Sequence, residues 1–330
     1  MRHVLAAFLL LATAAVAQQP PDLAKTLDSQ RTRNDRAFED TQRMVDDAMW
    51  YWRLGDVATI DKFEIASSKP RREKNATDIN AGNPLIFPVY VFAPRNLKGK
   101  APVLIFAHGG VHGRLTSNYA HIFREGLERG FVIVSPEYRG SIGHGADLYN
   151  QIDYGGAEID DTHDTRDWAV QNHPFVDPAR VGIFGWSHGG YHALMNILQW
   201  PDDYKVAYAG VPVSDLVARM GYTGQGYRDI FEEFIGKQPE DNVMEFRRRS
   251  PVYHAEKLRT PLLIHTTTND EDVHVLEVEH MIAALKAAGK QFEYKIYQNA
   301  PGAHRFNRID TKLAKESRRE MWDFLARYLK

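Results

Sequence analysis

The sequence predicts an α/β protein in which a mostly parallel sheet carries helices on both faces. Short, wholly apolar segments alternate with helical ones along most of the chain, as a sheet buried on both faces requires. Apolar residues make up 43% and charged residues 25%, a globular balance with ample material for a core. A Gly-x-Ser-x-Gly turn, residues 185–189, joins one apolar segment to a helical one.

The amino terminus has the anatomy of a secretory signal. Residues 1–17 combine a basic start, an apolar middle and a small-x-small ending. The apolar run is shorter than the roughly 20 residues that a membrane-spanning helix needs. We therefore expect cleavage near Ala17, a secreted or periplasmic protein, and no stable membrane anchor afterwards.

Charge and cysteine content exclude several kinds of partner. The formal net charge of −2 provides no general attraction for nucleic acid or for an anionic membrane. The sequence has no cysteine, so disulfides and thiolate metal sites are excluded. The expected partner is a small-molecule or short-peptide substrate, and the sequence does not indicate an oligomeric state.

Residues 18–55 form an expected helical extension ahead of the main domain. The segment is polar, rich in Arg and Asp, and ends in an aromatic cluster. Its apolar residues have helical spacing, which predicts an amphipathic helix packed on the main body. The predicted packing face consists of Phe38, Val45, Ala48, Met49 and Trp52.

Residues 56–330 read as one domain that begins with a hairpin and continues with alternating strands and helices. The hairpin comprises residues 57–66 and 85–92, separated by a charged loop over 67–83. Six further strands are expected at 103–107, 131–135, 181–184, 206–211, 262–266 and 292–297. Helices are expected at 118–129, 160–171, 192–199, 275–288 and 311–329. The total is about eight strands.

One segment, residues 215–257, interrupts the alternation. It is long, polar and aromatic, and it lies between two expected strands. Insertions at the carboxyl ends of strands lie over the active crevice of such sheets, so we expect this excursion to supply pocket walls. Tyr222 and Tyr227 are candidate substrate contacts; ordinary helix packing is the alternative for each aromatic residue.

The turn at residues 185–189 predicts a nucleophile elbow. A serine at a strained strand-to-helix corner, flanked by small residues, holds its hydroxyl out from the sheet. Ser187 occupies that position. The alternative is a glycine-rich turn without chemistry, but an acid and a base follow in the order Ser, Asp, His.

Serine needs a base to remove its proton and an acid to orient that base. The acid candidate is Asp270, which follows an apolar strand; Glu271 and Asp272 are alternatives that spacing alone does not separate. The base candidate is His304, in a Pro- and Gly-containing loop after the last strand.

A tetrahedral intermediate needs two backbone donors for its oxyanion. One expected donor is the amide of His188, directly after the nucleophile, and the other is Gly110 in the His-Gly-Gly segment that follows a strand. His108 and His112 are alternatives as metal ligands, as are the residues of the acidic segment 160–164. Because the triad accounts for the chemistry, we expect no metal and no cofactor.

Taken together, these motifs resemble the prolyl-oligopeptidase-type branch of the α/β-hydrolases from about residue 101 to the carboxyl terminus. The resemblance rests on segments 108–113, 137–145, 177–190, 250–253, 265–274 and 302–304. It implies Ser187, Asp270 and His304 as the triad. About 85 residues before the His-Gly-Gly strand are too few for the β-propeller that family peptidases carry, and His108 replaces a tyrosine that supplies an oxyanion hydroxyl in some members.

The resemblance favours an exported serine hydrolase that cleaves short peptides through an acyl-enzyme. A carboxylesterase acting on acyl or sugar esters is the alternative, and a non-catalytic binding protein on the same fold is a remote one. Asp272 falls where family peptidases often place an Arg or Asn that donates to a substrate carbonyl. A carboxylate only accepts, so Asp272 at the site favours an amine, hydroxyl or cation; otherwise it faces solvent or pairs with Arg305 or Arg308.

Overall fold

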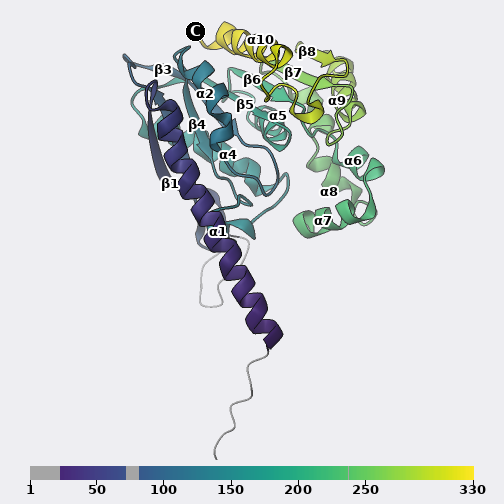
Figure 1. The fold of residues 1–330 in the computed structure, drawn as a ribbon. Coiled ribbons are helices and arrows are strands. Elements are labelled where there is room, and N and C mark those ends of the chain that lie inside the picture. The colour runs from purple at the N-terminus through teal and green to yellow at the C-terminus, as the bar shows by residue number, and fades with distance from the viewer. Residues whose placement is uncertain (1–22, 72–81, 237) are drawn as a thin grey trace, which may run out of the picture.

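A computed structural model describes residues 23–71, 82–236 and 238–330 of the chain. In these residues eight strands form one sheet in the order β1-β2-β4-β3-β5-β6-β7-β8 (Figure 1). β2 pairs antiparallel with β1 and β4, and all other neighbours are parallel. This arrangement confirms the predicted fold class. The strands are β1 (Ala58–Pro70), β2 (Pro84–Pro94), β3 (Ala101–Ala107), β4 (Val132–Pro136), β5 (Val176–Trp186), β6 (Val206–Gly210), β7 (Leu262–Thr267) and β8 (Glu293–Tyr297).

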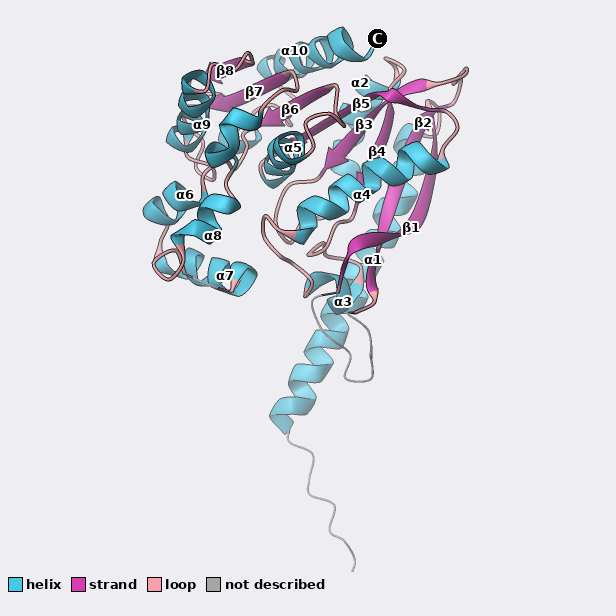
Figure 2. Ribbon diagram, turned by 180° about the vertical axis from the view of Figure 1, so that it is seen from behind, coloured by secondary structure: helices cyan, strands magenta, loops and turns pink. Residues whose placement is uncertain are grey.

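Helices cover both faces of the sheet. They are α1 (Leu23–Leu54), α2 (Ala120–Leu127), α3 (Gly145–Tyr149), α4 (Ala157–Asn172), α5 (His188–Gln199), α6 (Leu216–Tyr222), α7 (Gln225–Ile235), α8 (Val243–Arg248), α9 (Val275–Ala287) and α10 (Lys312–Leu329). Helices α2, α10 and the end of α1 pack on one face, and α4, α5 and α9 on the other (Figure 2). Among the described helices, none is long and apolar enough to cross a membrane.

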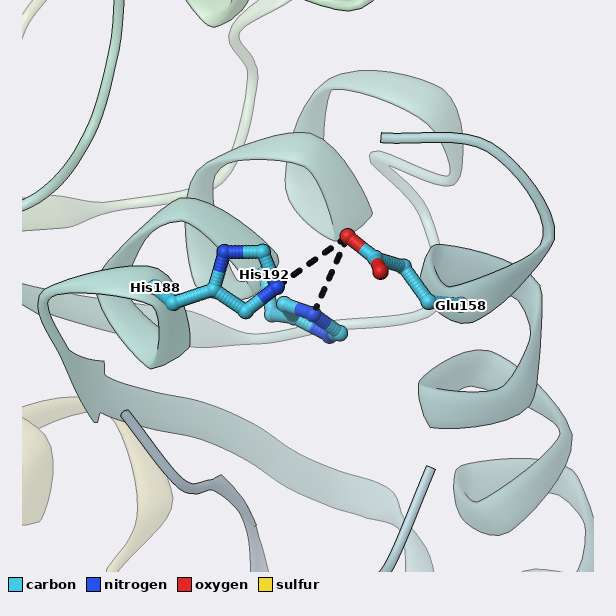
Figure 3. Close-up of side chains that lie close together, drawn as sticks. All are labelled: Glu158, His188 and His192. Carbon is cyan, nitrogen blue, oxygen red and sulfur yellow. Dashed lines mark ion pairs between the residues drawn. The ribbon is translucent and has the colours of Figure 1, made fainter. Parts of the chain in front are cut away.

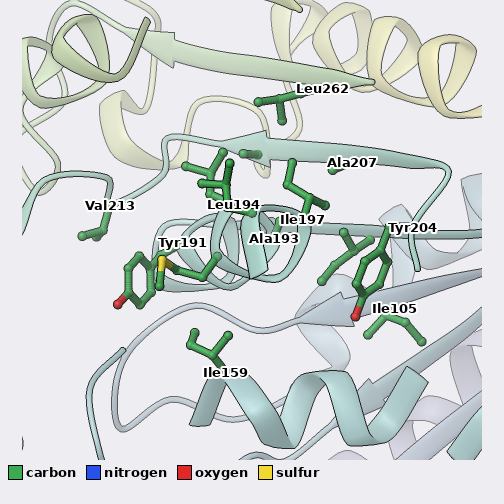
Figure 4. Close-up of a cluster of buried hydrophobic side chains, with 14 of the residues drawn as sticks. Ile105, Ile159, Tyr191, Ala193, Leu194, Ile197, Tyr204, Ala207, Val213 and Leu262 are labelled. Carbon is green, nitrogen blue, oxygen red and sulfur yellow. The ribbon is translucent and has the colours of Figure 1, made fainter. Parts of the chain in front are cut away.

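The central strands feed both cores because successive side chains point to opposite faces. In β3, Val103 and Ile105 join the core under α4 and α5, while Leu104 and Phe106 join the core under α2 and α10. Figure 4 shows the first of these cores around α5. Its side chains fix the position of α5 on the sheet, and α5 begins one residue after the predicted nucleophile.

Helix α1 contradicts the predicted packing face. Its amino-terminal half extends away from the body (Figure 1), and the predicted Phe38, Val45 and Trp52 are exposed, Trp52 by 79%. Trp50 and Leu54 are buried instead, and the Trp50 ring stacks on Phe123 with the centroids 5.3 Å apart. Apolar residues occur on several faces of this helix, so spacing alone could not identify the face that packs.

Two further expectations concern local boundaries. Helix α4 begins three residues before the expected position 160, and Asp161 is buried in an ion pair with Arg139, whose Nε lies 2.8 Å from Asp161 Oδ2. The excursion folds into α6, α7, α8 and a 3₁₀ helix, Pro251–Lys257. The predicted signal sequence, and residues 72–81 of the predicted loop, lie outside the described residues.

Candidate active site

The predicted nucleophile lies at the corner between β5 and α5. Ser187 has φ 59° and ψ −121°, a left-handed conformation that is strained for a residue with a side chain. Its backbone N–H donates to the Gly210 carbonyl on β6 at 2.9 Å, which holds the corner to the sheet. Strand β6 and the buried helix α5 therefore hold Ser187 in this strained conformation.

Glycine is required on both sides of the serine because backbones approach closely there. A Cβ on Gly185 would lie 2.5 Å from the Gly189 carbonyl carbon, and one on Gly189 would lie 2.0 Å from the Ala107 carbonyl oxygen. Both separations are shorter than a nonbonded contact permits. Both glycines of the Gly-x-Ser-x-Gly pattern are therefore required by the close packing of the backbone at this elbow, as the sequence predicts.

The predicted acid and base lie together in the structure. Asp270, after β7, is buried, and its carboxylate oxygens lie 2.8 and 2.9 Å from His304 Nδ1. The backbone N–H groups of Asp272 and Val273 donate to Asp270 Oδ1, each at 2.9 Å. These donors fix the carboxylate, which in turn fixes the imidazole ring with Nε2 directed away from Asp270.

Gly109 is the residue through which the Ser187 corner and the segment after His304 come near each other. A Cβ on Gly109 would lie 3.7 Å from Ser187 Cβ and 3.9 Å from Arg308 Nη1. Arg308 donates to the His304 carbonyl oxygen. The structure records no hydrogen bond between Ser187 and His304 among the described residues; catalytic hydrogen bonds often tighten only when substrate binds.

Asp272 lies beside the other nitrogen of the same ring. Its Oδ2 is 3.5 Å from His304 Nε2, and its side chain is 55% exposed. Its Oδ1 is 3.1 Å from Arg219 Nη2 on α6. The alternative in which Asp272 pairs with Arg305 or Arg308 is therefore wrong: its arginine partner is Arg219, which comes from the excursion.

Sequence reasoning missed Arg219, which joins the excursion to the site. It is 3% exposed and lies between Asp272 and Glu277, with Nη1 at 3.3 Å from Glu277 Oε2. Tyr227 accepts from its Nε at 2.8 Å, and Tyr222 accepts from Nη1 at 3.1 Å. The two candidate substrate contacts, Tyr222 and Tyr227, thus use their hydroxyls to hold Arg219. The only sequence signal was a single basic residue in an otherwise apolar helical segment.

Glu277 is the buried end of this network. Burial raises the pKa of its carboxyl group, and Arg219, Tyr222 and the backbone N–H groups of Ser214 and Asp215 oppose that shift. Tyr222 donates to Glu277 Oε2 at 2.6 Å. Glu277 therefore holds the Arg219 guanidinium, whose Nη2 lies beside Asp272.

The expected oxyanion donors are His188, which follows Ser187 in the chain, and Gly110, whose neighbour Gly109 lies near Ser187. Neither the His188 N–H nor the Gly110 N–H donates to another described residue, and Gly110 has φ 80°. His188 is the first residue of α5, where backbone N–H groups have no partner within the helix. Both groups are free to donate to an anion.

His108 does not replace a tyrosine hydroxyl at the oxyanion position. Its ring is fully buried, with Nε2 at 2.9 Å from Ser141 Oγ and 3.3 Å from Glu137 Oε2. Burial opposes ionisation of Glu137, but the nearby imidazoles of His108 and His144 outweigh it and lower the Glu137 pKa to about 2. His112 bonds through Nδ1 to the Gly140 carbonyl at 2.7 Å. His108 and His112 thus have structural partners, as Asp161 of the acidic segment has in Arg139.

The sheet order, the strained serine elbow and the Asp–His pair beyond it define this molecule as an α/β-hydrolase. Residues 118–330, more than half of the chain, match the family model described as the prolyl oligopeptidase family. The chain belongs to this family, as the motifs predicted.

Similarity to individual proteins is consistent with that membership. The chain is 32% identical to dipeptidyl peptidase 8 of Homo sapiens over 221 residues, which are 63% of this chain and 24% of that protein. It is 26% identical to dipeptidyl aminopeptidase BIII of Pseudoxanthomonas mexicana over 313 residues, 86% of this chain and 44% of that one. The acylaminoacyl peptidase of Pyrococcus horikoshii has a similar fold, with a TM-score of 0.70, 22% identity and coverage of 83% and 42% of the two chains. The chain thus spans less than half the length of each of these proteins.

Proposed function

We propose that this protein is a serine peptidase that cleaves short peptides through an acyl-enzyme, with Ser187, Asp270 and His304 as its triad. The observation that carries the proposal is the contact of 2.8 Å between His304 Nδ1 and Asp270, in a chain that also holds Ser187 at a strained elbow. Membership of a peptidase family supports the same reaction class.

Each side chain has one task in this mechanism. His304 Nε2 takes the proton from Ser187 Oγ as the oxygen attacks the carbonyl carbon, and it returns that proton to the leaving amine. Asp270 keeps the other ring proton on Nδ1 and stabilises the imidazolium that forms. The N–H groups of His188 and Gly110 donate to the oxyanion, a contribution of roughly 10²–10³-fold in kcat for one donor.

The names of the relatives support the proposed substrate class. They include a dipeptidyl peptidase and an acylaminoacyl peptidase, and short peptides are accordingly our proposal for this chain. We also propose that the protein is exported, because residues 1–17 have the pattern of a secretory signal. Amino-terminal sequencing of the mature protein, with Gln18 expected first, tests export.

A fluorophosphonate probe tests the nucleophile, because only an activated serine reacts readily with such a reagent. We expect labelling on Ser187, loss of labelling in Ser187→Ala and a sharp fall in His304→Ala. Ser141→Ala is a matched control, because Ser141 is a buried serine outside the triad. Persistent labelling of Ser187→Ala would exclude this elbow as the nucleophile.

Substrate type is tested with peptide p-nitroanilides beside p-nitrophenyl esters of the same acyl group. A peptidase hydrolyses both, and Ser187→Ala abolishes both reactions. Hydrolysis of the esters alone would contradict the proposed peptidase function and leave the triad in place, since esters need less help for their leaving group.

A further inference from the structure

Three buried side chains converge directly behind the nucleophile elbow (Figure 3). Glu158 comes from α4, and His188 and His192 come from consecutive turns of α5. Glu158 Oε1 lies 3.1 Å from His188 Nε2 and 3.7 Å from His192 Nε2. One ligand atom from each residue lies within 4.8 Å of the other two. The spacing of four residues places both histidines on the same face of the helix.

Few polar groups compensate the charge of this cluster: Glu158 Oε1 accepts one hydrogen bond, from the backbone N–H of Gly155 at 2.9 Å. Glu158 is fully buried, and its ion-pair contacts within the described chain are with these two imidazoles. Glu158 Oε2, both ring nitrogens of His188 and Nε2 of His192 have no hydrogen-bond partner among the described residues. A buried carboxylate without a cation is costly by several kcal/mol. The arrangement therefore calls for a positive charge shared by the three groups.

The spacing of the atoms fits a metal ion. Ligands about 2.1 Å from a tetrahedral ion lie roughly 3.4 Å from one another, a value that the 3.1 and 3.7 Å contacts bracket. The short contact from His188 Nε2 to Glu158 lacks the direction of a hydrogen bond. Ligands of a shared ion point toward the ion and not toward one another, so the orientation of these two groups agrees with metal binding.

The ring of His192 is already oriented as a metal ligand requires. Its Nδ1 lies 2.8 Å from Thr162 Oγ1, which leaves Nε2 directed at Glu158. Metal-bound histidines characteristically use their other nitrogen in such a bond.

We propose that Glu158, His188 and His192 bind a divalent transition-metal ion such as Zn²⁺ behind the nucleophile elbow. Two imidazoles and one carboxylate are a donor set that Zn²⁺ accepts. Aromatic rings close the site: the Tyr154 centroid is 4.6 Å from that of His188, and the Tyr138 centroid is 4.2 Å from that of His192. The ion has a structural role, because it would fix His188, the residue expected to supply an oxyanion donor.

Metal binding is measured on the full-length protein without reference to activity. The chain is stripped with a chelator, incubated with Zn²⁺, separated from free metal by gel filtration and analysed by mass spectrometry of the metal. We expect about one tightly held Zn²⁺ per chain and an increase in Tm of several degrees with added Zn²⁺. Co²⁺ should give visible absorption bands typical of tetrahedral nitrogen and oxygen ligands. Absence of tight binding would overturn the proposal and assign the shared charge to a proton.

Two variants locate the ion. His192→Phe fills a similar volume without a ligand atom and should lose both the bound Zn²⁺ and the Tm increase. His173→Phe is the control, because His173 ends α4, packs among aromatic rings and lies outside the cluster. Retention of Zn²⁺ and of the Tm increase in His192→Phe would overturn the site. If His192→Phe does not fold, Glu158→Gln replaces it, and unchanged Co²⁺ bands in that variant would likewise overturn the site.

Discussion

Helices α5 and α1 are attached to the same sheet in opposite ways. All residues of α5 except Gln199 are buried, and its packing forces the backbone of Ser187 into a strained conformation. In α1, Trp50 and Leu54 are the buried residues among those with described side chains, and polar contacts supply the remaining attachment. Asp46 accepts from Ser117 Oγ at 2.7 Å, and Asp47 accepts from the Tyr90 hydroxyl at 2.6 Å. Burial on all sides holds the backbone at Ser187 in one strained conformation, whereas α1 is attached by a few contacts near its carboxyl end.

The largest expected effect is a loss of catalytic activity at the candidate active site. Asp270→Asn should lower kcat by roughly 10²–10⁴-fold, because the amide holds His304 in the wrong tautomer. Folding should change little, since Asn keeps the size of the side chain. The measurements are kcat on a peptide p-nitroanilide and Tm. Glu271→Gln, at an exposed neighbour, is the control. If Asp272→Asn were the more damaging change, the acid would be Asp272.

A second test compares the two tryptophans of α1. Trp50→Ala should reduce the free energy of unfolding by about 3–5 kcal/mol, because a buried aromatic side chain leaves a cavity. Trp52→Ala should change it by no more than about 0.5 kcal/mol, because its ring is 79% exposed. Both values come from denaturant midpoints at unchanged slope. Equal losses would mean that α1 is held by the face predicted from the sequence.

The smallest expected effect concerns Asp272, a half-exposed carboxylate fixed by a buried arginine. Asp272→Asn should raise kcat/KM for neutral acyl-peptide substrates and lower it for substrates with a free amine. Each change should be at most about tenfold, or about 1.4 kcal/mol, for one exposed polar contact. Steady-state kinetics on acetylated and free forms of one peptide measure it, with Glu271→Gln as control. Equal effects on both substrates would remove Asp272 from substrate selection.

Features encoded in local sequence were the most predictable. The alternation of apolar segments predicted the sheet, and the glycines around Ser187 predicted the elbow. Both features depend on residues that are only a few positions apart in the chain. The strands were located correctly, although β5 begins five residues before the expected position 181. Asp270 and His304 were singled out by their order after the serine, and the structure brings them within hydrogen-bond distance.

Features that depend on distant packing were not predictable. Arg219 precedes Asp272 by 53 residues, and nothing in its segment indicates which acid it meets. The cluster of Glu158 with His188 and His192 forms because α4 and α5 lie side by side on one face of the sheet (Figure 2). The face of α1 that packs on the sheet depends on Phe92 and Phe123, whose rings contact the Trp50 ring. In each case the deciding neighbour lies on another element.

The strand order has a consequence for synthesis of the chain. Ser187 follows β5, Asp270 follows β7 and His304 follows β8, the strand at the edge of the sheet. During translation Ser187 therefore emerges more than a hundred residues before His304, its proposed base. The proposed hydrolytic activity needs both residues, so it can appear only after β8 and the loop that follows it have been made.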